Sequence, residues 1–322
     1  MSPNLFSFAT SELSQDAFIA WLASWADKKY CKHAPELNML ARKFLESLGA
    51  DEEVETVTII LQHKKIDLLI DINEKTLILI EDKTWSSHHG NQLNAYRKAI
   101  QDDEVYSQRD LKCIYFKTAD QANFDYVQEQ NYQPYTREQF LEVLNSGKHI
   151  QNDILIDYVA YLQSWDDKVQ AYENLPFSSW NGHAWIGFYV FISSHFEDVN
   201  FGYVSNPSGG FEACWLGLHN APNFYFQIGE KNRVSLRITG ETQEETKSIK
   251  EQWSDYLYSS LHNEDIKFDK RYIKLGKTMA LAHFDDVFLF NVDGVLDKEL
   301  TIGSIRNLKT SIEIILARPT PY

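Results

Sequence analysis

Apolar residues follow a helical period in two segments near the start of the chain. Over residues 10–26, large side chains such as Phe18 and Trp21 recur three or four positions apart, which places them on one face of a helix. A second helix is predicted over 35–48, and Gly49 ends it. Both patterns are typical of amphipathic helices that pack on a core.

Short strand-like runs follow these helices. Each run is apolar and is bounded by polar residues or glycine. The predicted strands cover 54–62, 65–72, 76–83 and 112–118, and a helix over 91–102 separates the last two. The resulting order, α-β-β-β-α-β, predicts an α/β domain.

A boundary divides the chain near its middle. Thr136–Gln139 has the pattern of a capping box that opens a helix, and a longer helix over 151–174 stops before Pro176. We therefore predict two domains, residues 1–175 and 176–322. The second domain reads as α+β with antiparallel strands. Its predicted helices cover 182–197, 241–262 and 301–316, and its strands lie near 201–218, 223–229, 233–238, 266–275, 278–284 and 287–292.

The hairpin between residues 65 and 83 carries charged residues in an otherwise apolar sequence. If its turn is centred on Glu74, Asp67 lies opposite Glu81. Because side chains alternate along a strand, Lys83 shares the face of Glu81, and the residue between them points the other way. Charges are expensive to bury without partners or a metal ion. Three charges directed at one patch therefore predict a functional site.

Two carboxylates and one ammonium suit metal-assisted hydrolysis. Carboxylate oxygens can hold a hard cation such as Mg²⁺ and leave positions for water and a phosphate. The cation acidifies its water and offsets charge on the phosphate oxygens. A neighbouring lysine can orient the water or neutralise the developing charge.

This arrangement resembles the core motif of the PD-(D/E)XK nuclease superfamily, in which an Asp on one strand precedes a Glu-x-Lys on the next. Asp67 and Glu81-Asp82-Lys83 match the motif, whereas Ile66 stands where the name of the superfamily has proline. The resemblance implies an α-β-β-β-α-β core with a central mixed sheet flanked by helices. It also implies a Mg²⁺- or Mn²⁺-dependent nuclease.

Two further features carry the resemblance, which covers roughly residues 5–145. Gln92 and Tyr96 are four positions apart on one helix face and look like the Q-x-x-x-Y element of the RecB-like branch. The first helix of the superfamily supplies a Glu that reaches the metal. Glu12 is the better match for that metal ligand, and Asp16, one turn later, is the reserve.

Composition is that of a globular protein. The 322 residues include 19 Phe, 17 Tyr and 8 Trp, which is enough apolar material for one large or two ordinary domains. Three scattered cysteines indicate reduced thiols, and neither a signal peptide nor a membrane span is expected. We therefore predict a cytoplasmic protein.

Net charge is the main argument against a nuclease. The chain carries 31 Lys and Arg against 46 Asp and Glu, giving −15, whereas nucleic-acid-binding proteins usually present a basic surface. The densest basic run lies at 267–277, where Lys270, Tyr272 and Lys274 would share one face of a strand. Cations beside an aromatic ring suit nucleic acid, although a solvated strand face explains them as well.

Two hypotheses therefore remain open. The first is a metal-dependent nuclease acting on nucleic acid, with DNA the expected substrate, and belonging to phage defence, restriction or repair. The second is a non-catalytic nuclease-fold module that binds a protein or a nucleotide through its C-terminal half. The second domain could also serve targeting, assembly or sensing, and a homo-oligomer or a protein partner is open for it.

Overall fold

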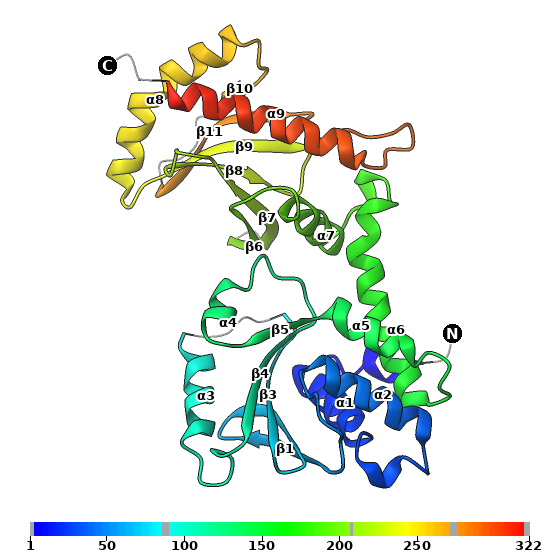
Figure 1. The fold of residues 1–322 in the computed structure, drawn as a ribbon. Helices are drawn as coiled ribbons and strands as arrows, with labels where there is room; N and C mark the ends of the chain where they lie inside the picture. The colour runs from blue at the N-terminus through cyan, green and yellow to red at the C-terminus, as the bar shows by residue number, and fades with distance from the viewer. Residues whose placement is uncertain (1–2, 86–89, 207–208, 271–275, 319–322) are drawn as a thin grey trace. The chain divides into compact units, whose positions relative to one another are not determined.

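The computed structural model describes residues 3–85, 90–206, 209–270 and 276–318 (Figure 1). The chain divides into two compact units, Met1–Asp167 and Lys168–Tyr322. The division falls near the end of a long helix, whereas the sequence placed the boundary at the proline that follows it. No helix in the described ranges has the length and apolar character needed to cross a membrane.

The first unit contains the predicted order of helices and strands, with additions. Its helices are α1 (Glu12–Ser24), α2 (Pro35–Ser47), α3 (Gln92–Gln101), α4 (Asp125–Glu129), α5 (Arg137–Ser146) and α6 (Asp153–Val169). Its strands are β1 (Val57–His63), β2 (Ile66–Ile72), β3 (Thr76–Lys83), β4 (Asp110–Lys117) and β5 (Gln133–Thr136). Thr136 and Gln139 form the predicted capping box at the start of α5.

These strands form one mixed sheet in the order β1-β2-β3-β4-β5. The pairs β1–β2 and β2–β3 are antiparallel, and β3–β4 and β4–β5 are parallel. The sequence did not predict α4 or β5. The short strand β5 contains Pro134, which a sheet tolerates because β5 lies at its edge.

Helices cover both faces of this sheet (Figure 1). Even-numbered residues of β2 and β3, such as Ile70 and Ile80, belong to a core cluster shared with α1, α2, α5 and α6. Odd-numbered residues such as Leu69 and Leu79 pack with Leu93 of α3. The strands β2 and β3 are therefore buried on both sides, which explains why they are apolar almost throughout.

The turn between β2 and β3 sets the register on which the site depends. Ile72 pairs with Thr76 across a three-residue loop, in which Asn73 and Glu74 have φ near +55° and +52°. The ladder continues to Leu68 opposite Ile80. The predicted register, centred on Glu74, is confirmed.

The second unit has a separate core. Its helices are α7 (Gly182–Ser193), α8 (Gln243–Asn263) and α9 (Lys298–Ala317). Its strands are β6 (Val199–Asn206), β7 (Gly209–Gly217), β8 (Phe224–Ile228), β9 (Arg233–Thr239), β10 (Asp269–Lys270) and β11 (Thr278–Asp285). They form an antiparallel sheet in the order β10-β11-β9-β8-β7-β6, and residues of all three helices share one core cluster with it.

Two predictions concern the last strands and the basic run of this unit. The strand expected over 287–292 is wrong, because Phe290 makes only an isolated bridge with Leu296. In the basic run, Lys270 ends β10 and its ammonium lies 4.2 Å from the centroid of the Tyr258 ring. Tyr272 and Lys274 lie outside the described residues.

The core clusters give a prediction about independent folding. The clusters of the first unit draw on residues between Phe6 and Leu162, and that of the second unit begins at Tyr172. A fragment of residues 1–175 is therefore expected to unfold in one cooperative transition, measured by near-ultraviolet circular dichroism. A matched fragment that ends at 145 lacks the buried Tyr158 and Leu162 and should not fold. A fragment 1–175 without a near-ultraviolet signal would contradict the prediction.

Candidate active site

Two side chains contact the Glu81 carboxylate at the end of β3, and a third supports one of them. The Lys83 ammonium lies 2.6 Å from Glu81 Oε1, and Gln92 Nε2 donates to the same oxygen at 2.7 Å. Gln92 Nε2 also donates to the Tyr96 hydroxyl at 3.0 Å, from the next turn of α3. Glu81 is completely buried, and its other oxygen, Oε2, has no hydrogen-bond partner among the residues that the structure describes.

Asp67 lies beside Glu81, as the register requires. Asp67 is the residue next to Leu68, which forms the last β2–β3 pair with Ile80. Its Oδ2 accepts the Asp82 backbone N–H at 3.1 Å. The charge of Asp67 raises the pKa of Glu81, which places the two carboxyl groups near each other. The structure therefore brings together Asp67, Glu81, Lys83, Gln92 and Tyr96.

The electrostatics of this cluster are dominated by burial. Burial raises the pKa of Glu81 to about 7, and the Asp67 charge adds to the rise, while the Lys83 ammonium opposes it. Burial also raises the pKa of Asp67. For Lys83, burial lowers the pKa, but the hydrogen bond and charge of Glu81 outweigh it, and the net shift is upward.

Two ionised carboxylates and one ammonium leave this group with a net charge of −1. Because burial raises the pKa of Glu81 to about 7, a proton on Glu81 can remove that charge near neutral pH. The short Lys83–Glu81 contact and the raised pKa of Lys83 agree that Lys83 stays charged. A divalent cation could replace that proton.

The two carboxylates of Asp67 and Glu81 fit a hard cation. The unpaired, buried Glu81 Oε2 supplies an oxygen without a competing donor. Among the described residues no three His, Cys, Asp or Glu side chains are grouped closely enough to hold a metal ion. The predicted three-carboxylate set with Glu12 therefore stays a prediction.

Glu12 lies at the same edge of the sheet. Its Oε1 accepts the backbone N–H of Thr84, the residue after β3, at 2.9 Å. Its charge influences Asp67 and raises the pKa of Lys83. The first turn of α1 thus places an acid beside the end of β3.

Asp82 lies on the opposite face of β3, where it faces α1. Its Oδ1 accepts a hydrogen bond from Gln15 Nε2, and Gln15 Oε1 accepts one from the Tyr158 hydroxyl of α6. Burial raises the pKa of Asp82 well above its usual value, and the adjacent Asp16 raises it further. Asp16 therefore belongs to this second, buried carboxyl pair.

Gln15, Tyr158 and Lys117 were not predicted from the sequence. Lys117 ends β4 opposite Lys83, and its ammonium donates to the Thr84 carbonyl at 2.9 Å. Burial lowers the pKa of Lys117 to about 8. A signal was present, because β3 and β4 both end in Lys-Thr, and parallel strands bring their ends to one edge.

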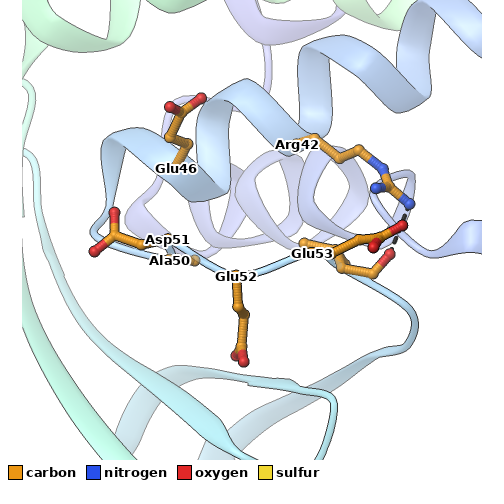
Figure 2. Close-up of a pocket in the computed structure, with 7 residues that line it drawn as sticks. Arg42, Glu46, Ala50, Asp51, Glu52 and Glu53 are labelled. Carbon is orange, nitrogen blue, oxygen red and sulfur yellow. Dashed lines mark hydrogen bonds between the residues drawn. The ribbon is translucent and has the colours of Figure 1, made fainter.

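A surface pocket in the first unit is separate from this cluster. It has a volume of about 210 Å³ and is lined mainly by acidic side chains around Arg42 (Figure 2). Arg42 donates to the Val54 carbonyl and to Asn38, and Glu52 pairs with Lys75. The one cation of the lining already has internal partners, so the pocket offers no clear ligand site.

Comparison with known proteins gives one match. A family model described as the PD-(D/E)XK nuclease superfamily matches residues 3–179, more than half of the chain. No curated protein and no solved structure matches the chain.

The Asp16–Asp82 pair gives a prediction for stability. Burial and the Asp67 charge raise the pKa of Asp16 to about 7. A carboxyl group whose pKa is raised on folding contributes stability below its unfolded pKa, near 4, and loses it as pH rises through 7. Asp16→Asn removes this ionisation, so it should stabilise the metal-free protein by on the order of 2–3 kcal/mol at pH 8 and hardly at pH 4.

Urea unfolding with a chelator present, at both pH values, measures the effect. Asp51→Asn, which changes an exposed aspartate of the same unit, is the matched control. It should leave the free energy of unfolding unchanged at both pH 4 and pH 8. Equal pH dependence in Asp16→Asn and the parent would show that Asp16 ionises without penalty.

Proposed function

This chain belongs to the PD-(D/E)XK nuclease superfamily, and on that premise we propose that it is a metal-dependent nuclease that hydrolyses phosphodiester bonds in DNA. The observation that carries the proposal is the convergence of Asp67, Glu81 and Lys83 in a buried cluster with one uncompensated negative charge. Such a charge is costly to keep unless a cation balances it.

Asp67 and Glu81 would hold Mg²⁺ or Mn²⁺ through their carboxylate oxygens. When bound, the cation supplies an acidified water and stabilises negative charge on the phosphate. Lys83 holds Glu81 by an ion pair and presents an ammonium that can stabilise charge on a phosphate oxygen. Gln92 fixes the orientation of Glu81 and is itself held by Tyr96, which supports the RecB-like assignment.

Glu12 is proposed as an additional ligand, direct or through water. It lies at the end of β3 and interacts electrostatically with Asp67. Asp16 is disfavoured for this role, because its side chain is buried beside Asp82 on the other face of the strand.

A non-catalytic module is the second candidate, and the charge of the first unit favours it. Residues 1–167 hold 16 Lys and Arg against 27 Asp and Glu, giving −11. Such a surface repels a polyanion. The paired Lys83 and Glu81 weigh against this candidate, because binding alone does not need a buried ammonium beside two carboxylates.

The second unit is proposed to target the enzyme, assemble it or sense a ligand. Residues 168–322 hold 15 Lys and Arg against 19 Asp and Glu, giving −4, so this unit repels nucleic acid less strongly. A role in phage defence, restriction or repair and a cytoplasmic location would suit such a nuclease.

Substitution at Lys83 and Asp67 tests the mechanism. Lys83→Ala should remove most cleavage, a loss of at least about 100-fold, because it removes a preorganised charge. It should retain metal binding, since Glu81 can still ionise. Asp67→Ala should lose both cleavage and metal binding. The measurements are plasmid and oligonucleotide cleavage with Mg²⁺ or Mn²⁺, and calorimetric metal titration.

Lys28→Ala is the matched control, because Lys28 also pairs with a glutamate, Glu55, but at an exposed site. It should cleave like the parent. Full cleavage by purified Lys83→Ala, with contaminating nuclease excluded, would count against the mechanism. Metal binding without cleavage of any single- or double-stranded DNA or RNA by the parent would favour the non-catalytic module.

Glu12 and Asp16 can be separated by two neutral substitutions. Glu12→Gln should weaken Mg²⁺ affinity more than Asp16→Asn, because Glu12 lies at the end of β3 and acts on both Asp67 and Lys83, whereas Asp16 is buried beside Asp82. The half-saturating Mg²⁺ concentration for cleavage and the calorimetric affinity measure the difference. A larger effect of Asp16→Asn would place the metal nearer the Asp16–Asp82 pair.

A further inference from the structure

An aromatic pair lies at the edge of the sheet where the candidate site ends. Trp85 is the second residue after β3, so its Cα lies at most about 7 Å along the chain from that of Lys83. The intervening Thr84 receives a hydrogen bond from Lys117 on its carbonyl and donates its N–H to Glu12. Trp85 is thereby tied to the same strand ends as the cluster.

Trp85 is largely exposed, with a relative accessibility of 54%. Its ring lies 4.7 Å from that of Trp165 of α6, at an interplanar angle of 51°. Trp165 is only partly buried. The pair therefore offers indole surface to solvent beside a site whose Glu81 and Lys83 are buried.

Trp165 is held in place from two sides. Its ring lies 5.5 Å from that of Tyr161, which neighbours the buried Tyr158. The adjacent Asp166 accepts a hydrogen bond from Arg137, and Arg137 also donates to the Thr118 carbonyl at the end of β4. This clamp fixes the exposed pair against the ends of the parallel strands.

Charge explains what such a pair could add to substrate binding. The first unit has a net charge of −11, so release of counterions from nucleic acid contributes little affinity there. The ammonium of Lys83 and the guanidinium of Arg137 are already bound to carboxylates. Stacking of a base on an aromatic ring does not depend on net charge and contributes about 1–3 kcal/mol per base.

We propose that Trp85, supported by Trp165, stacks against an unpaired base next to the scissile phosphate, so that the enzyme selects single-stranded nucleic acid or single-stranded ends. The inference rests on the proposed nuclease function. In a duplex the bases are stacked on one another and cannot offer a face to Trp85. Trp85 is then a specificity-determining residue, and it has no role in the chemical step.

The test is a binding titration with the full-length protein in Ca²⁺, which binds oxygen ligands with looser geometry than Mg²⁺. There are three probes: a labelled thymidine oligomer, the same backbone without bases, and a duplex. The oligomer has about 12 nucleotides, which is within the range of single-strand site sizes. The parent should bind the oligomer more tightly than the base-free backbone or the duplex. Trp85→Ala should weaken oligomer binding about 5- to 150-fold and leave the salt dependence unchanged.

Two further variants separate stacking from packing. Trp85→Phe keeps an aromatic face and should retain most of the affinity. Trp85→Leu keeps apolar bulk against Trp165 but has no aromatic face, so it should bind as weakly as Trp85→Ala while its melting temperature stays near that of the parent. Tyr203→Ala, which removes an exposed aromatic residue of the second unit, is the matched control and should bind like the parent.

Binding and cleavage give separate answers. Parent-like oligomer binding by Trp85→Ala, or equal affinity of the parent for the base-free backbone, would overturn the stacking role and leave the nuclease proposal standing. Trp85-dependent binding without cleavage in Mg²⁺ or Mn²⁺ would support stacking and refute the nuclease proposal. Trp85-dependent binding with cleavage of the same oligomer supports both.

Discussion

The register between β2 and β3 is the constraint on which the site depends. The three-residue loop after Ile72 pairs it with Thr76, and the ladder then carries Asp67 to the level of Glu81. Because side chains alternate with a period of two, a slip of one residue would move Asp67 to the opposite face of the sheet. The left-handed conformations of Asn73 and Glu74 in a short loop help to fix this register.

A second consequence of the alternation is that acidic groups lie on both faces of β3. Glu81 faces α3 with Asp67 and Lys83, and Asp82 faces α1 with Asp16. Each face contains two carboxyl groups in a buried environment, which disfavours ionisation of both. The first face pairs the Lys83 ammonium directly with Glu81 and reaches the partly exposed Asp67, and these features make it the better place for a cation.

The acidic character of the first unit limits how it can bind nucleic acid. Lys83, Lys117 and Arg137 lie near the ends of the parallel strands, but each interacts with a protein oxygen. They therefore hold groups of the site in place and add little positive potential around it. Affinity must come from bound cations, from aromatic contacts or from the second unit, and these sources differ in their dependence on salt.

The sequence by itself determined the hairpin, the helices and strands next to it, and the charged residues that the hairpin brings together. The apolar runs and the polar turn fixed the register, and with it the meeting of Asp67, Glu81 and Lys83, because these are local relations within about 17 residues. The helix period placed Gln92 and Tyr96 on one face in the same way. The capping box at Thr136 is also a local pattern, and it was predicted correctly.

Only the tertiary structure decided which distant groups meet. Gln15 bridges Asp82 and Tyr158, which are 67 and 143 positions away, and the pairing of β4 with β3 brings Lys117 beside Thr84. Trp85 meets Trp165 because α6 is clamped to the strand ends. No local period encodes these contacts, since they arise from the packing of elements that are far apart in the sequence.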